Sequence, residues 1–438
     1  MEVVGALTWI ALGAWLVLAT WWWWGMRRMP YLSASRGASG DAAAAPPPGG
    51  WPAVSLVVAA RDEAATIAAA LRTWLAQDYA ALEIVIVDDR SRDGTLAVVE
   101  EMLAGEQASG TEAAHAASGG PSVRCLRVDE LPEGWLGKVH AQSRGAALGH
   151  GAWLLFVDAD VRLVPSAVRT AVAAALRADA DHLALLPRFD APRGWAGHLV
   201  LAFEAAFALL LTVLLRPWRA PDPRTPTTLG IGAFGLYRRS AYDRSGGHEA
   251  VRMRPDDDLA LAASVKRSGG SSLVAFGPAL ASVTWYPTLG EAMRGLEKNA
   301  FAGLRYSVPL VVLVGLGLLA THVLPFAVAL VGSGAARAAG VAVVLVVTMV
   351  YAWYGRRSDT PAWYALLHPV SVMALVWAMV RSTFATLASG RIEWRGTSYA
   401  LADLRAARER DAARRQPRSR AEAREAGPTG QSRNRPRT

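Results

Sequence analysis

The sequence predicts an α/β domain with a mostly parallel sheet, placed between one N-terminal membrane-spanning helix and about three C-terminal ones. Three observations lead to this prediction. Between residues 51 and 300 of the 438-residue chain, short apolar runs typical of buried strands alternate with helical runs. Residues 3–24 form an uncharged run long enough to cross roughly 30 Å of hydrocarbon. Most of the other long apolar runs come after residue 307.

The N-terminal run is typical of an uncleaved anchor, residues 1–29, rather than of a signal peptide. No basic residue precedes it, its apolar core is long, and Arg27 and Arg28 follow it. Because basic residues that flank a span stay in the cytoplasm, we expect a multi-pass protein of the cell membrane whose next domain is cytoplasmic. A single cysteine, Cys125, excludes an intrachain disulfide and agrees with that compartment.

Residues 301–390 are expected to form the C-terminal transmembrane region. Three spans are the simplest count, and two to four remain open. The apolar runs are 308–331, which Pro309, His322 and Pro325 interrupt, 338–354 and 365–387.

The tail, residues 391–438, is basic, with 13 Arg against 6 Asp and Glu. Its composition predicts a disordered segment near anionic lipid headgroups, and spans directly before it favour lipid over nucleic acid as the partner. Three late spans would carry this tail outside, whereas its charge favours the cytoplasm. The sequence leaves that conflict open.

Five strands and four helices are predicted in the central domain, residues 51–300. We expect strands at 54–59, 83–88, 123–128, 153–158 and 182–187. We expect helices at 63–76, 95–104, 138–148 and 165–178. Residues 30–50 would be a linker, and 108–120, rich in Ala, Gly and Ser, a flexible insertion.

A further apolar stretch at about 195–218 is predicted to be a helix lying on the bilayer surface. It contains Glu204. A single crossing there would also place Asp158 and Asp160 on the opposite side of the membrane from everything that follows.

Carboxylates follow three of the predicted strands, where ligands bind to parallel sheets. The first strand leads into Asp62 and Glu63. The second ends at Asp88 and Asp89, and the fourth is followed by Asp158 and Asp160. A turn or a helix cap would explain any one set. Carboxylates that converge on one cleft repel each other, however, and need cations or hydrogen-bond donors between them.

Four motifs in order resemble the family 2 glycosyltransferases, whose nucleotide-binding domain has the GT-A fold, which is Rossmann-like. They are VVAARDEAATI, VIVDDRSRDGT, FVDADVRL and PDDDLALA, within residues 51 to about 290. GWLGKVHA, RGLEKNAF and GRIEWRGTSY are similar to the subgroup associated with hopanoid and carotenoid (diaponeurosporenoate-type) glycosylation. That subgroup also has one anchor before the domain and several spans after it.

The resemblance implies a transferase that uses a nucleotide-diphosphate sugar and a divalent ion. In the Asp-x-Asp motif, Asp160 would hold Mg²⁺ or Mn²⁺, which prefer oxygen ligands, and Asp158 would lie on the sugar and ribose side. The positions that would bind the UDP part of the donor are Ala60, Asp62, Glu63, Asp88 and Asp89.

Lys138 is one of only three lysines in a chain rich in arginine, which suggests a compact charge on phosphate, with a surface lysine as the alternative. The glycines of LGIGAFG, Gly230, Gly232 and Gly235, would allow close backbone approach to donor or acceptor, or form a tight turn.

Inversion at the anomeric carbon needs a base that takes the acceptor's proton. PDDDLALA supplies Asp256, Asp257 and Asp258. Aligning the resemblance on Lys266 makes the last two the family's acidic pair, with Asp258 as the base and Asp257 as the second candidate. Acids that stabilise a helix N-terminus would account for one or two of the three.

The processive synthases of this superfamily carry a Gln-x-x-Arg-Trp motif after the base, which is missing here. We therefore expect transfer of a single sugar from a UDP-sugar to a lipid or polyisoprenoid acceptor. A polyprenyl-phosphate or extracellular-glycan glycosyltransferase is the alternative. An inactive scaffold is the third reading, and the presence of Asp160 and of all three acids at 256–258 disfavours it.

Overall fold

The computed structural model describes residues 2–33, 47, 49–108, 121–394 and 397–406. Most of the expected linker at 30–50, nearly all of the insertion at 108–120 and the tail from residue 407 lie outside these residues.

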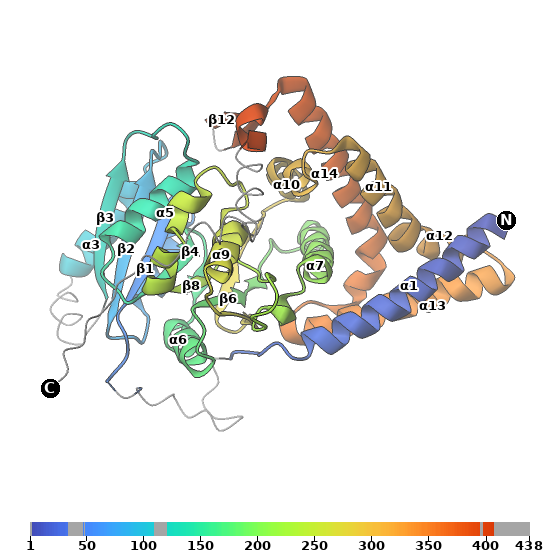
Figure 1. Ribbon diagram of the computed structural model, residues 1–438, viewed down its shortest axis with the longest axis horizontal. Helices are drawn as coiled ribbons and strands as arrows, with labels where there is room; N and C mark the ends of the chain where they lie inside the picture. Colours follow the sequence, from blue (N-terminus) through green and yellow to red (C-terminus); the bar gives the residue numbers. More distant parts are fainter. Residues whose placement is uncertain (1, 34–46, 48, 109–120, 395–396, 407–438) are drawn as a thin grey trace, which may run out of the picture.

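Seven strands form the central sheet of the α/β half of the molecule (Figure 1). Their order is β3-β2-β1-β4-β8-β6-β9, and only β8 runs antiparallel to its neighbours. The mostly parallel sheet is therefore confirmed. The strands are β1 Val54–Ala60, β2 Leu82–Asp89, β3 Ser122–Val128, β4 Trp153–Asp158, β6 His182–Leu186, β8 Gly235–Arg238 and β9 Ser272–Phe276.

Helices cover both faces of this sheet because its strands are apolar on both sides. Along β2, Ile84 and Ile86 pack into one core and Val85 and Val87 into the other. The first core takes α2 Ile67–Leu75, α3 Thr95–Ala108 and α6 Ala167–Arg177; the second takes α5 Gly137–Leu148 and α9 Asp257–Arg267.

The five predicted strands and four predicted helices are all present, within four residues at each end. The elements predicted from the sequence did not include β8, β9 or a small second sheet. That sheet contains β5 Arg162–Leu163, β10 Ala281–Val283 and β7 Arg188–Phe189. These strands have two to five residues, too few to show a period, and pairing with neighbours defines them.

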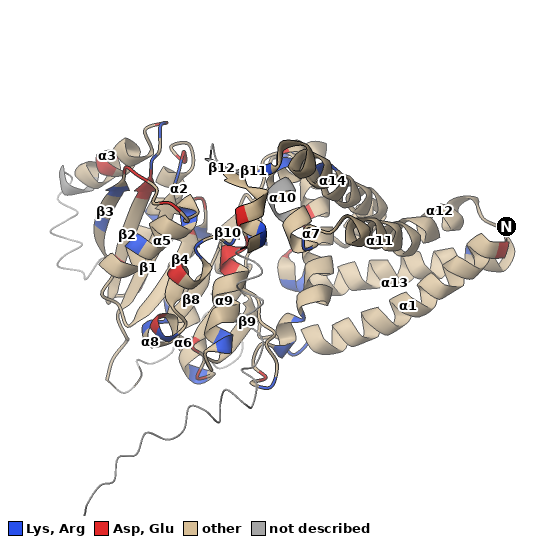
Figure 2. Ribbon diagram, turned by 45° about the horizontal axis from the view of Figure 1, so that its top comes forward, with Lys and Arg blue, Asp and Glu red and all other residues tan. Residues whose placement is uncertain are grey.

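Among the described residues, five helical stretches are long and apolar enough to cross a membrane. Charged residues are concentrated in the α/β half, whereas α1 and α13 have almost none along their lengths (Figure 2). The helices are α1 Glu2–Met26, α7 Trp195–Leu215, the continuous run α11 Val308–Leu318, η3 Leu319–Val323 and α12 Leu324–Val331, then α13 Gly334–Ser358, and η4 Ala362–Leu367 with α14 His368–Ser389.

The run 308–331 is one helix despite Pro325. A proline cannot donate to the carbonyl four residues earlier, here that of Thr321, and its ring crowds that oxygen. The chain widens into a π-helical turn, η3, just before the proline. The freed Thr321 carbonyl accepts a hydrogen bond from Trp15 Nε1 of α1 at 2.9 Å. A neighbouring helix thus satisfies the backbone group.

Helix α7 returns the chain to the domain that it left. Strand β6 before it and strand β8 after it are neighbours in the central sheet. Its Glu204 is fully buried, whereas Trp195 and Leu214 are exposed. The chain therefore enters and leaves α7 from the same sheet, and the position of this helix on the bilayer surface stays a prediction.

The expectation of a disordered tail does not hold for residues 391–394 and 397–406. Strands β11 Arg391–Trp394 and β12 Thr397–Ala400 form a hairpin. Ile392, Leu401 and Leu404 pack into one cluster with Phe301 and Met379. Apolar side chains among the arginines are buried against two helices, α14 and α10 Leu289–Gly303, which composition alone does not reveal.

Candidate functional site

The predicted acids meet at one edge of the central sheet, because the parallel strands that precede them end together. Ala60 at the end of β1 pairs with Asp88 of β2, and Ala59 pairs with Asp158 at the end of β4. Strand pairing therefore brings the first, second and fourth acidic segments to the same place.

Asp62 holds two loops together. Its Oδ1 accepts the Arg92 N–H at 2.8 Å, and its own N–H donates to Ser91 Oγ at 3.0 Å. The next amide, that of Glu63, donates to Thr95 Oγ1 at 2.8 Å. Asp62 has a φ of 55°, in the left-handed region that Asp tolerates better than most residues. The loops after β1 and β2 are thus fixed relative to each other.

Asp88 and Asp89 point to opposite faces of the sheet, as successive strand residues do. Asp89 is 2% exposed and ion-paired to Arg90 Nε at 2.8 Å and to Arg61 Nη1 at 3.7 Å. Asp88 is 1% exposed, and neither of its carboxylate oxygens has a hydrogen-bond partner among the described residues. A buried carboxylate without a donor is costly, which makes Asp88 a candidate to accept a hydrogen bond from a ligand.

Lys138, in the first turn of α5, lies among acids from two other segments. Its Nζ is 2.5 Å from Asp158 Oδ1. Burial would lower the pKa of the Lys138 ammonium, but the charges of Asp158, Asp257 and Asp258 raise it above its ordinary value. The alternative of a plain surface lysine does not fit this environment.

Gly232 lies between Asp158 and Asp258 and is hydrogen-bonded to both. Its N–H donates to Asp258 Oδ2 at 2.9 Å, and its carbonyl accepts the Asp158 N–H at 3.1 Å. A Cβ at this position would lie 2.6 Å from Asp158 Oδ2 and 3.0 Å from Lys138 Nζ. The glycine therefore allows a close approach within the protein itself.

The three acids at 256–258 occupy different environments. Asp256 is bound by Arg254, whose Nε and Nη2 donate to its two oxygens at 2.7 and 2.6 Å. Asp257 and Asp258 begin α9 and face Lys138. Burial and the neighbouring charge of Asp257 raise the pKa of Asp258, while Lys138 and the Leu259 N–H act in the opposite direction. The last two acids are thus the pair in the site.

Asp160 lies in a strongly negative environment. Burial and the charges of Asp158 and Glu63 raise its pKa to about 7. Within the described chain, no group of three or more His, Cys, Asp and Glu side chains could hold a metal ion by itself. The Asp160 carboxylate thus lies among negative charges and has few other protein ligands beside it. Such a carboxylate fits a Mg²⁺ or Mn²⁺ ion that also binds phosphate oxygens and water.

The sequence reading gave no role to several residues of this site. Arg61 and Arg90 hold Asp89, although neither was assigned a function. His140 is 6% exposed, its Nδ1 has no hydrogen-bond partner in the described part of the chain, and its ring contacts Trp135. The motif GWLGKVHA contains this histidine, but only the fold shows that α5 brings it close enough to interact with Asp89.

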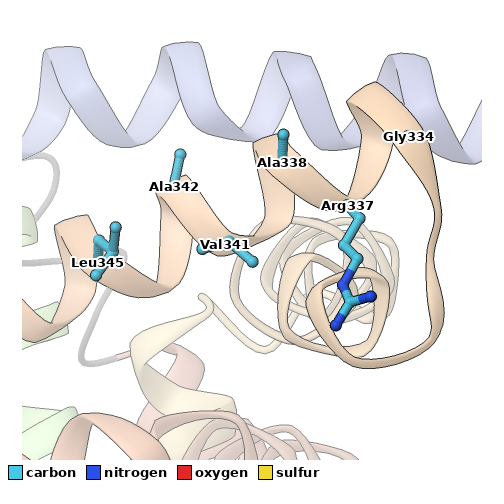
Figure 3. Close-up of a pocket in the computed structure, with 6 residues that line it drawn as sticks. All are labelled: Gly334, Arg337, Ala338, Val341, Ala342 and Leu345. Atoms are coloured by element: carbon cyan, nitrogen blue, oxygen red, sulfur yellow. The ribbon is translucent and has the colours of Figure 1, made fainter.

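Two cavities lie away from the acids. One of about 440 Å³ runs along the start of α13, beside Arg337 and Val341 (Figure 3). The other, of about 620 Å³, borders Trp153 and Arg239 at the edge of the sheet where β4 begins, opposite the acids.

Comparison with known proteins agrees with this geometry. Residues 55–246 match glycosyl transferase family 2. The succinoglycan biosynthesis protein ExoO of Rhizobium meliloti (strain 1021) is 33% identical over 129 residues, which is 30% of this chain and 30% of that protein's length. The mannosyltransferase PcManGT from Pyrobaculum calidifontis, solved with GDP-Man and Mn²⁺, has a TM-score of 0.52 and 17% identity and covers 87% of this chain and 99% of its own. The likeness to PcManGT concerns the fold alone. That fold is the expected GT-A fold.

Proposed function

Because residues 55–246 match glycosyl transferase family 2, we propose that this chain is a membrane-associated enzyme that moves a single sugar from a UDP-sugar to a lipid or polyisoprenoid acceptor, with inversion and with Mg²⁺ or Mn²⁺. The observation that carries this proposal is the convergence of Asp158, Asp257 and Asp258 around Lys138. In such a site the Lys138 ammonium would bind the diphosphate. The carboxylates would bind a metal ion and supply the general base.

The donor's nucleoside would bind where β1 and β2 end. Asp88, which is buried and has no hydrogen-bond partner among the described residues, would accept the imide N–H of uracil, which would compensate its burial. The loop that Asp62 and Glu63 hold in place would carry the ribose, with Ala60 beneath it and Asp89 fixed by its two arginines.

The diphosphate would bind between Lys138 and Asp160. Lys138 would transfer its contact from Asp158 to a phosphate oxygen, and Asp158 would then contact the sugar and ribose side of the donor. Asp160 would hold the divalent ion, which when bound supplies positive charge to the leaving diphosphate.

Asp258 would take the acceptor's proton. Two backbone N–H groups, those of Gly232 and Leu259, fix its carboxylate in one orientation. Its raised pKa brings a carboxylate closer to the range in which a general base is effective. Asp257 is the second candidate for this role.

The acceptor would reach this site from the bilayer. The apolar helices and the arginines Arg27 and Arg28 support a cell-membrane enzyme whose catalytic domain is cytoplasmic. An enzyme that builds an extracellular glycan is the second candidate, because the succinoglycan biosynthesis protein ExoO is among the relatives.

One assay tests the proposal. Detergent-solubilised protein is incubated with UDP-glucose, UDP-GlcNAc or GDP-mannose, with Mg²⁺, Mn²⁺ or EDTA, and with or without a membrane lipid extract, and nucleotide release is measured. We expect release that needs both metal and lipid and that Asp160→Asn and Asp258→Asn lose. A labelled lipid product supports the first candidate, and a labelled polysaccharide the second. No release with any donor would refute the enzyme proposal.

A further inference from the structure

Helices α1 and α13 both end against the α/β domain. After α1, the Leu32 N–H donates to the Phe276 carbonyl at 2.8 Å, and the Phe276 N–H donates to the Pro30 carbonyl at 2.9 Å, at the end of β9. Arg357, in the last turn of α13, donates its Nη1 hydrogen to the Met29 carbonyl at 2.9 Å. We call this level of the helical bundle its domain end.

After α13 the chain turns back into the bundle instead of leaving it. His368, the first residue of α14, lies with its Nδ1 3.0 Å from Tyr351 Oη and its Nε2 2.9 Å from His322 Nδ1. Tyr351 precedes the end of α13 at Ser358 by two helical turns, roughly 10 Å. If the hydrocarbon layer of about 30 Å ends near Ser358, helix α14 would begin well inside that layer.

Helix α14 then returns to the domain end. The Phe301 N–H of α10 donates to Ser382 Oγ at 3.2 Å. Beyond α14, Arg405 Nη2 donates to the Tyr306 carbonyl at 3.4 Å. Tyr399 of β12 packs against the same core as Met253, which lies three residues before Asp256.

We infer that residues 359–389 form a re-entrant element, which enters and leaves the bilayer on the side of the catalytic domain. Among the described helices, α1, the helix 308–331 and α13 would then be the ones that cross the membrane. One face of α14 is buried against the protein, and the other would contact lipid chains. Its exposed apolar residues recur at helical spacing: Val370, Met373, Trp377, Phe384 and Leu387.

The distribution of charge supports this topology independently. Arg27, Arg28, Arg356 and Arg357 lie at the domain end, whereas Arg337 is the one basic residue between α12 and the middle of α13. If only the helix 308–331 and α13 cross the membrane after the catalytic domain, the tail lies on the same side as the four arginines at the domain end. The tail has 13 Arg against 6 Asp and Glu, which agrees with that side. The conflict between an odd number of late spans and a basic tail then disappears.

Cysteine accessibility in sealed membrane vesicles tests the inference. The native Cys125 is exposed on the α/β domain and reports that domain's side. In a Cys125→Ala background, Ala402→Cys reports the end of the chain after α14, and Ser333→Cys, between α12 and α13, reports the far end. Both positions are exposed. A membrane-impermeant maleimide is applied to inside-out and to right-side-out vesicles, and thermal unfolding in detergent verifies that each variant is folded.

We expect Ala402→Cys to be labelled in the same vesicles as Cys125, and Ser333→Cys only in vesicles of the other orientation. Labelling of Ala402→Cys together with Ser333→Cys would overturn the inference. Trypsin provides a second measurement without a cysteine: it should remove a C-terminal epitope in vesicles whose Cys125 is accessible. Protection of the epitope there would also overturn it.

Discussion

Lys138 Nζ lies 2.5 Å from Asp158 Oδ1, and the same ammonium is stabilised by the charges of Asp257 and Asp258. The lysine comes from the first turn of α5, Asp158 from the end of β4, and the other two acids from the start of α9. One ammonium group thus interacts with three carboxylates from two other segments. A diphosphate that binds there must take over part of that pairing.

Replacing Lys138 by methionine should reduce kcat/KM on the order of a hundredfold, because it removes a charge aimed at the leaving group. Lys138→Arg should recover only part of this, since Gly232 leaves no room beside Lys138 Nζ for a planar guanidinium. Arg72→Met, which removes an exposed charge on α2, is the matched control. A Lys138→Met enzyme as active as that control would contradict the role proposed for this lysine.

Asp160→Asn should raise the Tm of metal-free protein above pH 7. The pKa of Asp160, raised to about 7, means that the folded protein holds this proton more tightly than the unfolded chain, so stability falls as the pH rises from about 4 to 7. The variant lacks this loss, and the two Tm values should converge near pH 4.

Mn²⁺ separates the metal role from the pH effect. It should raise the Tm of the wild type, because an ion that binds only the folded state stabilises it, and should leave Asp160→Asn unchanged. An equal shift in both proteins would place the ion elsewhere.

The pH dependence of kcat/KM should identify the base. A base must be deprotonated, and the pKa of Asp258 is raised, so activity should fall on acidification at a pH above the ordinary range of Asp. Asp257→Asn removes a neighbouring negative charge and should move that limb to lower pH. Asp258→Asn should cost about 10²–10⁴ in rate.

The control for this experiment is Asp256→Asn, whose carboxylate is engaged by Arg254 rather than by Lys138. It should keep the wild-type profile. If Asp257→Asn abolishes activity and Asp258→Asn only shifts the profile, the two roles are exchanged.

Asp88→Leu should stabilise the protein without nucleotide and weaken UDP binding. The substitution removes a buried carboxylate for which the described part of the chain supplies no donor, and with it the acceptor proposed for the uracil N–H. Calorimetric titration with UDP and thermal unfolding measure the two effects. A lower Tm together with unchanged UDP affinity would show that Asp88 is structural. Glu101→Gln, an exposed acid on α3, serves as the reference variant.

The sequence by itself determined the parts of this protein that depend on local pattern. Periodic apolar runs predicted the positions of β1, β2, β3, β4 and β6 and of the long apolar helices. This was possible because the residues of a segment themselves show whether it can form a buried strand or a membrane span. The order of the acidic motifs likewise predicted one shared edge of a parallel sheet.

The tertiary structure decided which groups meet. The close pairing of Lys138 with Asp158, the bridge that Gly232 forms to Asp258 and the separate pairing of Asp256 with Arg254 all depend on distances between segments, which no local pattern contains. The path of α14 was decided in the same way. Its composition alone fits a full span, and its contacts with Tyr351 at one end and Phe301 near the other are the basis of the re-entrant path that we infer.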